Sequence, residues 1–300
     1  MRRKLLSSIL FLLSFAFVSA SAQRPFSLTT VHRNLSYVTN GHERQKLDLY
    51  LPSPPVVRTW ETPPKDGYKK RLPLVIWIHG GAFFVGSKND TVPLELLSEG
   101  YAVASIDYRL SGDAKFPAQI EDCKTAVRWL RANAARFALD TERFAAFGES
   151  AGGYLAVMLG TTGDVKEFDV GENLEQSSRV KAVIDFYAPT DFLQNAFAVA
   201  NPKSPEAQLI GGAIMENKDK AAKANPIAYI TKTNAPFLIV HGDADKSVPY
   251  NQSELLVAAL KNANVPVSFY TVKGGGHGDF DDPKIRQLIT EFLAKRLKGK

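Results

Sequence analysis

Cysteine is almost absent from the 300-residue sequence, in which Cys123 is the single example. One thiol excludes an intramolecular disulfide, so the fold must be stabilised by its core alone. Cys123 lies in a segment with helical apolar periodicity, and we expect it to be a buried core residue. The composition, 45% hydrophobic and 23% charged, is that of a globular protein with a sizeable core.

Long apolar runs are also scarce, and the most marked one, residues 5–18, lies near the N-terminus after a basic start. Its length of about 14 residues falls short of the roughly 20 that span a bilayer, and small residues follow it. This pattern predicts a signal peptide over residues 1–22, cleaved after Ala22 or, alternatively, after Ala20. We expect a secreted or periplasmic protein over residues 23–300, with no membrane association after cleavage.

A strong excess of one charge is missing as well. The chain has 37 Lys and Arg against 31 Asp and Glu, and three of the basic residues belong to the expected signal. Such a balance lacks the basic footprint of a nucleic-acid-binding protein. We therefore expect no nucleic-acid partner.

Between residues 72 and 272, short apolar segments alternate with helical ones. Nearly continuous apolar strands separated by helices predict an α/β fold with a mainly parallel sheet covered on both faces. Two β-like segments precede this alternation and predict an edge hairpin. The expected strands are 35–38, 46–51, 74–78, 101–106, 144–147, 182–187, 237–240 and 267–272, and the expected helices are 93–99, 117–137 and 151–159.

Two segments depart from the alternation. Residues 52–72 are rich in proline, which predicts a surface loop. Residues 192–233 carry scattered prolines and short helical pieces, which predict an insertion that forms a cap over the site. Because no repeat or linker is present, we expect residues 23–300 to form one domain.

The sharpest motif is Gly148-Glu149-Ser150-Ala151-Gly152-Gly153, which lies between an expected strand and an expected helix. In a G-x-S-x-G turn, the glycines remove side chains that would collide as the backbone reverses, and the serine is presented at a helix N-terminus. The sequence therefore predicts Ser150 as a nucleophile.

A second glycine-rich turn, His79-Gly80-Gly81-Ala82-Phe83, ends another apolar strand. Glycines there let backbone amides approach an oxyanion. We expect Gly80, Gly81 and Ala151 to supply the donors of an oxyanion hole, and His79 to brace the turn rather than act as a base.

The general base is expected late in the chain, because hydrolases with this serine turn order the triad as serine, acid and histidine. His277, in a glycine-rich loop after the last strand, meets this requirement. His32 and His42 lie in the expected hairpin region, and His241 ends a buried strand, where we expect a structural role.

The acid is expected in the loop after the strand at 237–240, which offers both Asp243 and Asp245. Either aspartate can bond the turn's own amides instead, as turn aspartates usually do. The residues alone leave this choice open.

Four aromatic residues, Phe83, Phe84, Tyr187 and Phe192, lie near the expected mouth of the site. They are candidates to line an acyl pocket that fits a cinnamoyl ring. The alternative is that these four aromatic residues belong to the core.

Five motifs stand in order along residues 40 to 297: HGGAF (79–83), DYRL (107–110), GESAGG (148–153), HGDADKSVP (241–249) and GGGHG (274–278). Together they resemble the carboxylesterase branch of the α/β-hydrolases. Within this branch, the signal and two further runs, Phe116-Pro117-Ala118-Gln119 and Ala188-Pro189-Thr190-Asp191, resemble secreted bifunctional feruloyl and acetyl xylan esterases.

The resemblance implies an α/β-hydrolase fold with an eight-stranded sheet, a scaffolding role for residues 107–109, and Asp245 as the acid. Ala82 stands where relatives of hormone-sensitive lipase carry glycine, a departure that leaves the backbone donors intact.

The implied function is that of a serine esterase that needs no metal or organic cofactor and hydrolyses plant-cell-wall acetyl or feruloyl esters, free or linked to a polysaccharide. Alternatives are a general short-chain carboxylesterase or lipase-like enzyme, a peptidase, and an inert hydrolase-fold binding protein. The sequence does not predict the oligomeric state.

Overall fold

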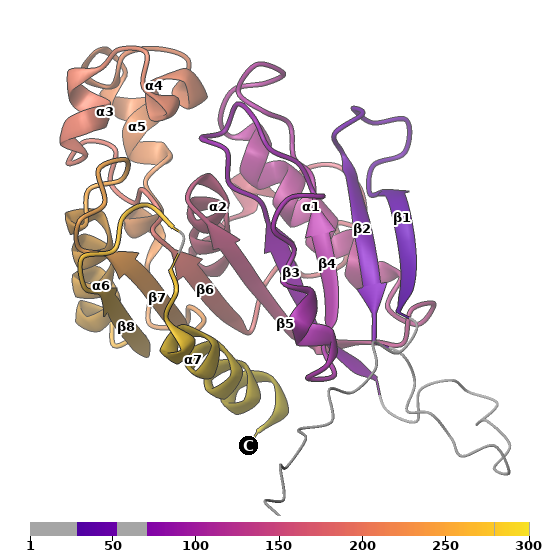
Figure 1. Ribbon diagram of the computed structural model, residues 1–300. Helices are drawn as coiled ribbons and strands as arrows, with labels where there is room; N and C mark the ends of the chain where they lie inside the picture. The colour runs from indigo at the N-terminus through magenta and orange to yellow at the C-terminus, as the bar shows by residue number, and fades with distance from the viewer. Residues whose placement is uncertain (1–28, 53–70, 279, 300) are drawn as a thin grey trace, which may run out of the picture.

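The computed structural model describes residues 29–52, 71–278 and 280–299, so the expected signal and nearly all of the 52–72 loop lie outside the described residues. In the described part, eight strands form one sheet in the order β1-β2-β4-β3-β5-β6-β7-β8 (Figure 1). β2 is antiparallel to both β1 and β4, and every other pair is parallel, which confirms the mainly parallel sheet and the edge hairpin. The strands are β1 Thr30–Ser36, β2 Lys46–Leu51, β3 Leu72–Ile78, β4 Ala102–Ile106, β5 Leu139–Glu149, β6 Ala182–Phe186, β7 Phe237–Gly242 and β8 Val267–Val272.

Helices cover both faces of the sheet. Alternate residues of each central strand point to opposite sides, so both faces present apolar side chains to the helices. In β3, Ile76 and Ile78 join a core cluster with side chains of α1, α2 and α6, whereas Val75 and Trp77 join a second cluster with α7. These helices are α1 Ala118–Ala132, α2 Ala151–Thr161, α6 Asn251–Asn262 and α7 Pro283–Leu293. None of the helices within the described ranges is both long and apolar enough to cross a membrane.

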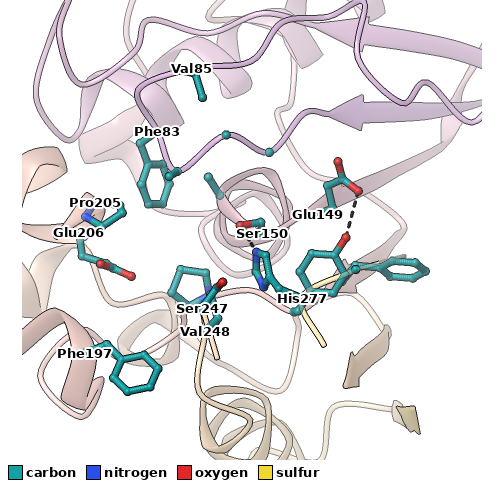
Figure 2. A pocket seen from close by; sticks show the side chains of 18 of the residues that line it. Phe83, Val85, Glu149, Ser150, Phe197, Pro205, Glu206, Ser247, Val248 and His277 are labelled. Atoms are coloured by element: carbon teal, nitrogen blue, oxygen red, sulfur yellow. Dashed lines mark hydrogen bonds between the residues drawn. The ribbon is translucent and has the colours of Figure 1, made fainter. Parts of the chain in front are cut away.

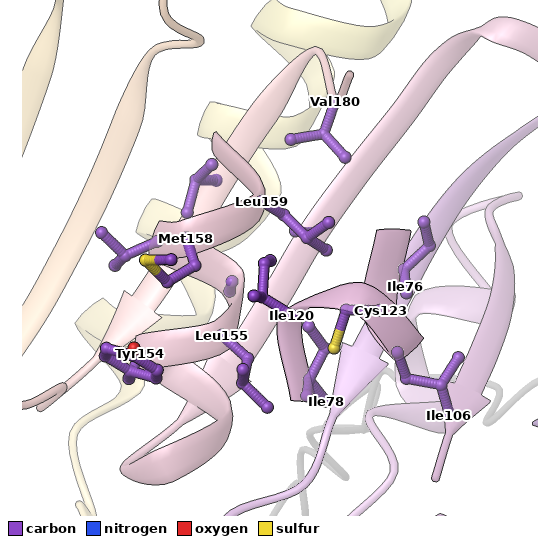
Figure 3. Close-up of a cluster of buried hydrophobic side chains, with 14 of the residues drawn as sticks. Ile76, Ile78, Ile106, Ile120, Cys123, Tyr154, Leu155, Met158, Leu159 and Val180 are labelled. Carbon is purple, nitrogen blue, oxygen red and sulfur yellow. The ribbon is translucent and has the colours of Figure 1, made fainter. Parts of the chain in front are cut away.

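Figure 3 shows the larger cluster, in which Ile78 and Ile106 of the sheet face Cys123 of α1 and Leu155 of α2. Cys123 is fully buried, as expected, and burial raises the pKa of its thiol well above the ordinary value. The thiol therefore fills space in the core.

The segment 192–233, which the sequence predicts as a cap, lies between β6 and β7 and contains α3, α4 and α5, which lie together in Figure 1. Ser150 follows β5, and the loops after β7 and β8 carry the expected acid and base. Because the carboxyl ends of parallel strands meet at one edge of a sheet, these loops and the cap converge there. The cap elements are α3 Ala196–Ala200, α4 Pro205–Ile210, η3 Ile214–Glu216, α5 Lys218–Lys223 and η4 Pro226–Tyr229.

Candidate active site

Ser150 occupies a strained turn between β5 and α2, with φ 53° and ψ −120°. A Cβ atom on Gly148 would lie 2.2 Å from the carbonyl oxygen of Gly152, and one on Gly152 would lie 2.0 Å from that of Ile78. Positions 148 and 152, two residues before and two after the serine, therefore have no room for a side chain. The amide of Ser150 donates to the carbonyl oxygen of Phe186 over 2.8 Å, which ties the turn to β6. Such positive φ values persist in non-glycine residues only where the surroundings impose them.

The structure brings Ser150, His277 and Asp245 into one hydrogen-bonded chain. Nε2 of His277 lies 3.0 Å from Oγ of Ser150, and Nδ1 lies 2.7 Å from Oδ2 of Asp245. In the neutral ring, Nδ1–H donates to the carboxylate and Nε2 accepts from the serine hydroxyl. This is the arrangement in which a histidine can take the serine proton.

The Asp245 carboxylate is surrounded by donors. Besides His277, the ring of His241 approaches Oδ2 at 3.2 Å, and the amides of Ser247 and Val248 donate to Oδ1 over 2.7 and 2.9 Å. Burial would raise the pKa of Asp245, but the hydrogen bonds from His241, His277 and the two amides outweigh it and hold the pKa well below the ordinary value. The group therefore remains a carboxylate.

Asp243, the competing candidate, is exposed, and its carboxylate bonds Lys273 and Gly274 rather than His277. Its Oδ2 pairs with Nζ of Lys273 at 3.0 Å, and its Oδ1 accepts from the amide of Gly274 over 2.6 Å. The hydrogen bond from Lys273 is the main cause of its lowered pKa. Asp243 thus fastens the loop that leads to His277, and the geometry selects Asp245, as the family resemblance does.

The proposed oxyanion donors gather beside Ser150. Gly80, Gly81 and Ala151 all line the cavity that contains the serine, and a Cβ on Gly80 would lie 3.5 Å from the serine Cβ. Ala151 is the first residue of α2, where an amide has no acceptor within its own helix. Amides at a helix N-terminus are suited to receive developing negative charge.

His79 braces the glycine-rich turn, as expected from the sequence. Its Nδ1 lies 2.7 Å from the carbonyl oxygen of Gly80, and its ring stacks on Tyr108 with centroids 4.5 Å apart. The tyrosine hydroxyl donates to the carbonyl oxygen of His79 over 3.0 Å. Oδ1 of Asp107 lies 3.5 Å from Nε2 of His79 and accepts from the amide of Lys88 over 2.8 Å, so residues 107 and 108 support this turn and the loop after it.

The site opens into a cavity of about 860 Å³, shown in Figure 2. Of the four aromatic candidates, Phe83 and Tyr187 line it. Phe84 and Phe192 are not among its lining residues, so their assignment to the pocket is wrong. Phe84 is 46% exposed, and Phe192 is fully buried with its ring stacked on Tyr154. The turn that buries Phe83 leaves Phe84 exposed, and Phe192, the first residue of the cap, packs into the core.

The cap supplies a polar wall that the sequence did not predict. Phe197, Asn201, Ser204 and Glu206 line the cavity from this side, and Figure 2 shows Glu206 and Phe197 opposite the Glu149 side of Ser150. Glu206 is only 6% exposed, accepts a hydrogen bond from Asn195 over 3.2 Å, and has a pKa raised by burial. The run Ser-Pro-Glu signals a helix start, but no sequence signal shows that this helix faces the cavity.

Within the described ranges, no group of three or more His, Cys, Asp or Glu side chains is placed to hold a metal ion. The chemistry offered by the described residues is that of a nucleophile, a base, a carboxylate and backbone amides.

Comparison with known proteins identifies the family of this chain. Residues 62–260 match the family model described as BD-FAE. The chain belongs to the BD-FAE family. Among solved structures, a truncated carbohydrate esterase from gut microbiota is 32% identical, with a TM-score of 0.79 and coverage of 92% of this chain and 99% of that one. The fold is therefore that of the α/β-hydrolase esterases.

Two further relatives are longer than this member of the BD-FAE family. A bifunctional GH43-CE protein of Bacteroides eggerthii is 37% identical with a TM-score of 0.77, covering 89% of this chain and 38% of that one. Esterase LipC of Mycobacterium tuberculosis is 30% identical over 71% of this chain and 55% of its own length. The chain spans about half the length of the curated relatives that it matches first, 48% to 55%.

Proposed function

We propose that this protein is a carboxylic ester hydrolase that works through an acyl-enzyme on Ser150. The observation that carries the proposal is the unbroken chain from Ser150 through His277 to Asp245, placed in a cavity beside three candidate amide donors. Its esterase relatives support the same reaction.

Acylation begins when Nε2 of His277 takes the Ser150 proton while Oγ attacks the ester carbonyl carbon. The amides of Gly80, Gly81 and Ala151 stabilise the resulting oxyanion. Collapse of the tetrahedral intermediate breaks the bond to the alcohol oxygen, which leaves with the proton held by His277.

Deacylation repeats these steps with water as the nucleophile. His277 removes a proton from water, the hydroxide adds to the acyl carbon, and collapse releases the acid while the proton returns to Ser150. Throughout, Asp245 orients the imidazole and stabilises its charged form without accepting the proton.

For the substrate, we propose acetyl or feruloyl esters of plant-cell-wall polysaccharides. The cavity combines aromatic lining, from Phe83 and Tyr187, with the polar cap wall of Asn201, Ser204 and Glu206. Aromatic surface suits a cinnamoyl ring, and buried hydrogen-bonding groups suit the hydroxyls of a sugar alcohol. The similarity to a carbohydrate esterase supports this choice.

We also propose that the protein is exported, from the signal-like pattern of residues 1–22. N-terminal sequencing of the protein recovered from outside the cytoplasm should begin at Gln23. An N-terminus at Met1 would contradict export with cleavage.

The reaction and the substrate class are tested together by a panel of acetylated xylan, methyl ferulate and nitrophenyl esters of rising chain length. The wild type should hydrolyse short esters and the cell-wall substrates, and Ser150→Ala should abolish all turnover. Undiminished turnover by the variant would refute the reaction. Equal kcat/KM on long-chain esters would refute the substrate class and favour a general carboxylesterase.

The polar wall has its own test. Glu206→Gln should lower kcat/KM for acetylated xylan more than for nitrophenyl acetate, because only the former brings hydroxyls to the cap. Glu216→Gln, an exposed position on the same cap, is the matched control. Equal losses on both substrates would argue against sugar recognition by Glu206.

A further inference from the structure

His241, which ends β7, is fully buried and touches the Asp245 carboxylate. Its Nδ1 lies 2.7 Å from Oγ of Ser253, and its Nε2 lies 3.2 Å from Oδ2 of Asp245 and 3.1 Å from the carbonyl oxygen of Val248. We propose that His241 is a positioning residue for the reaction: its Nε2–H donates to Asp245 and fixes the carboxylate against His277. This inference rests on the proposed esterase function.

The surroundings of His241 determine where its proton lies. Both neighbours of Nε2, the carboxylate of Asp245 and the carbonyl of Val248, are acceptors, so Nε2 must carry the proton. Ser253 can donate its hydroxyl hydrogen to Nδ1, so the neutral Nε2–H tautomer satisfies both ring nitrogens.

This proton completes the shell of donors around Asp245. Oδ2 is shared by two imidazoles, those of His277 and His241, while Oδ1 accepts from the amides of Ser247 and Val248. A carboxylate offers about four lone-pair sites, so this shell leaves it no freedom to rotate. Oδ2 thereby stays directed at Nδ1 of His277.

The His241 ring is itself fixed. The ring of Tyr250 lies 5.5 Å from it and that of Tyr187 lies 6.3 Å away, both in edge-on contact. Tyr187 also approaches the His277 ring, at 4.6 Å. A second imidazole, held in place by these rings, therefore contacts the same oxygen of Asp245 as the base does.

Two substitutions separate positioning from simple packing. In His241→Gln, the amide nitrogen can take the place of Nε2 and still donate to Asp245. In His241→Asn, the shorter side chain keeps a partner for Ser253 but loses the donor to Asp245. Both variants lose the buried ring, so each controls for the packing loss of the other.

We expect His241→Asn to lower kcat roughly 10- to 100-fold with little change in KM, since a hydrogen bond to a charged group is worth about that factor. His241→Gln should retain kcat within about threefold, because it keeps this bond. Thermal melting of each variant checks that the comparison is made on folded protein. Equal kcat values for the two variants would overturn the proposal.

A measurement on the wild type keeps the proposal testable if the variants do not fold. Long-range ¹H–¹⁵N correlation spectra of histidine-labelled protein should show His241 with its proton on Nε2, and a proton on Nδ1 alone would overturn the proposal. This spectrum needs no turnover. A failure of the proposed esterase function, seen as no hydrolysis by the wild type, is therefore distinguishable from a failure of the His241 assignment.

Discussion

Asp185 lies in β6 and Asp245 lies in the loop after the neighbouring strand β7. Both side chains are shielded from solvent, yet their pKa values are shifted in opposite directions. Among the residues that the structure describes, Asp185 of β6 accepts one hydrogen bond, from the amide of Ala188 over 3.2 Å, and its Oδ2 has no partner. Burial raises the pKa of Asp185 to about 8. Asp245, with donors on both oxygens, has a lowered pKa despite its burial.

The difference shows that the number of donors, rather than burial alone, determines whether a carboxyl group at this edge of the sheet is charged. Asp245 is equipped to act as an anion beside His277. Asp185 is equipped only as a neutral acid, and the proposed mechanism assigns it no step.

The largest effect is expected from Asp245→Asn, which removes the anion from the catalytic chain. We expect kcat for nitrophenyl acetate to fall by about 10³- to 10⁴-fold, because the neutral amide neither stabilises the imidazolium nor selects the correct tautomer. A loss of less than about tenfold would show that the carboxylate is not the orienting acid.

Asp185→Asn tests the other member of the pair through stability. Because its folded pKa lies above the unfolded value, the native state binds more protons, so its contribution to stability is complete at acid pH and is lost as pH rises toward 8. The slope is at most about 1.4 kcal/mol per pH unit. Removing the titrating group should flatten the wild-type decline in the free energy of unfolding between pH 5 and 8, and an unchanged decline would contradict the assignment.

The smallest effect is expected from Asp243→Asn, the control for Asp245. Asparagine can still accept from the amide of Gly274, and an exposed pair such as that with Lys273 contributes little. We expect kcat to stay within about twofold of the wild type. A loss as large as that of Asp245→Asn would restore Asp243 as the candidate acid.

Some parts of the site could be predicted from sequence because their chemistry is local. Ser150 lies in a short motif whose first glycine, Gly148, is required by a contact within the turn, whereas Gly152 is required by the close approach of Ile78 on β3. The strand before the motif and the helix after it are both visible as patterns. The expected helix 117–137 instead ends at Ala132, where Asn133 caps it and turns follow. The end of a helix depends on individual capping hydrogen bonds, and apolar periodicity does not reveal these bonds.

Other parts depend on how distant segments meet. Nothing local distinguishes Asp245 from Asp243, because the choice is made by a histidine 32 positions away from Asp245. For the same reason, periodicity could not show that Phe192 packs on Tyr154 or that Glu206 faces the cavity. His241 was expected to have a structural role at the end of its strand, and its contact with Asp245 became visible only in the fold.

Covalent labelling with a fluorophosphonate determines whether Ser150 is an activated nucleophile. We expect one adduct per chain, located on Ser150 by peptide mass spectrometry and absent from Ser150→Ala. A folded wild-type protein that forms no adduct, or forms it at another residue, would refute Ser150 as the nucleophile.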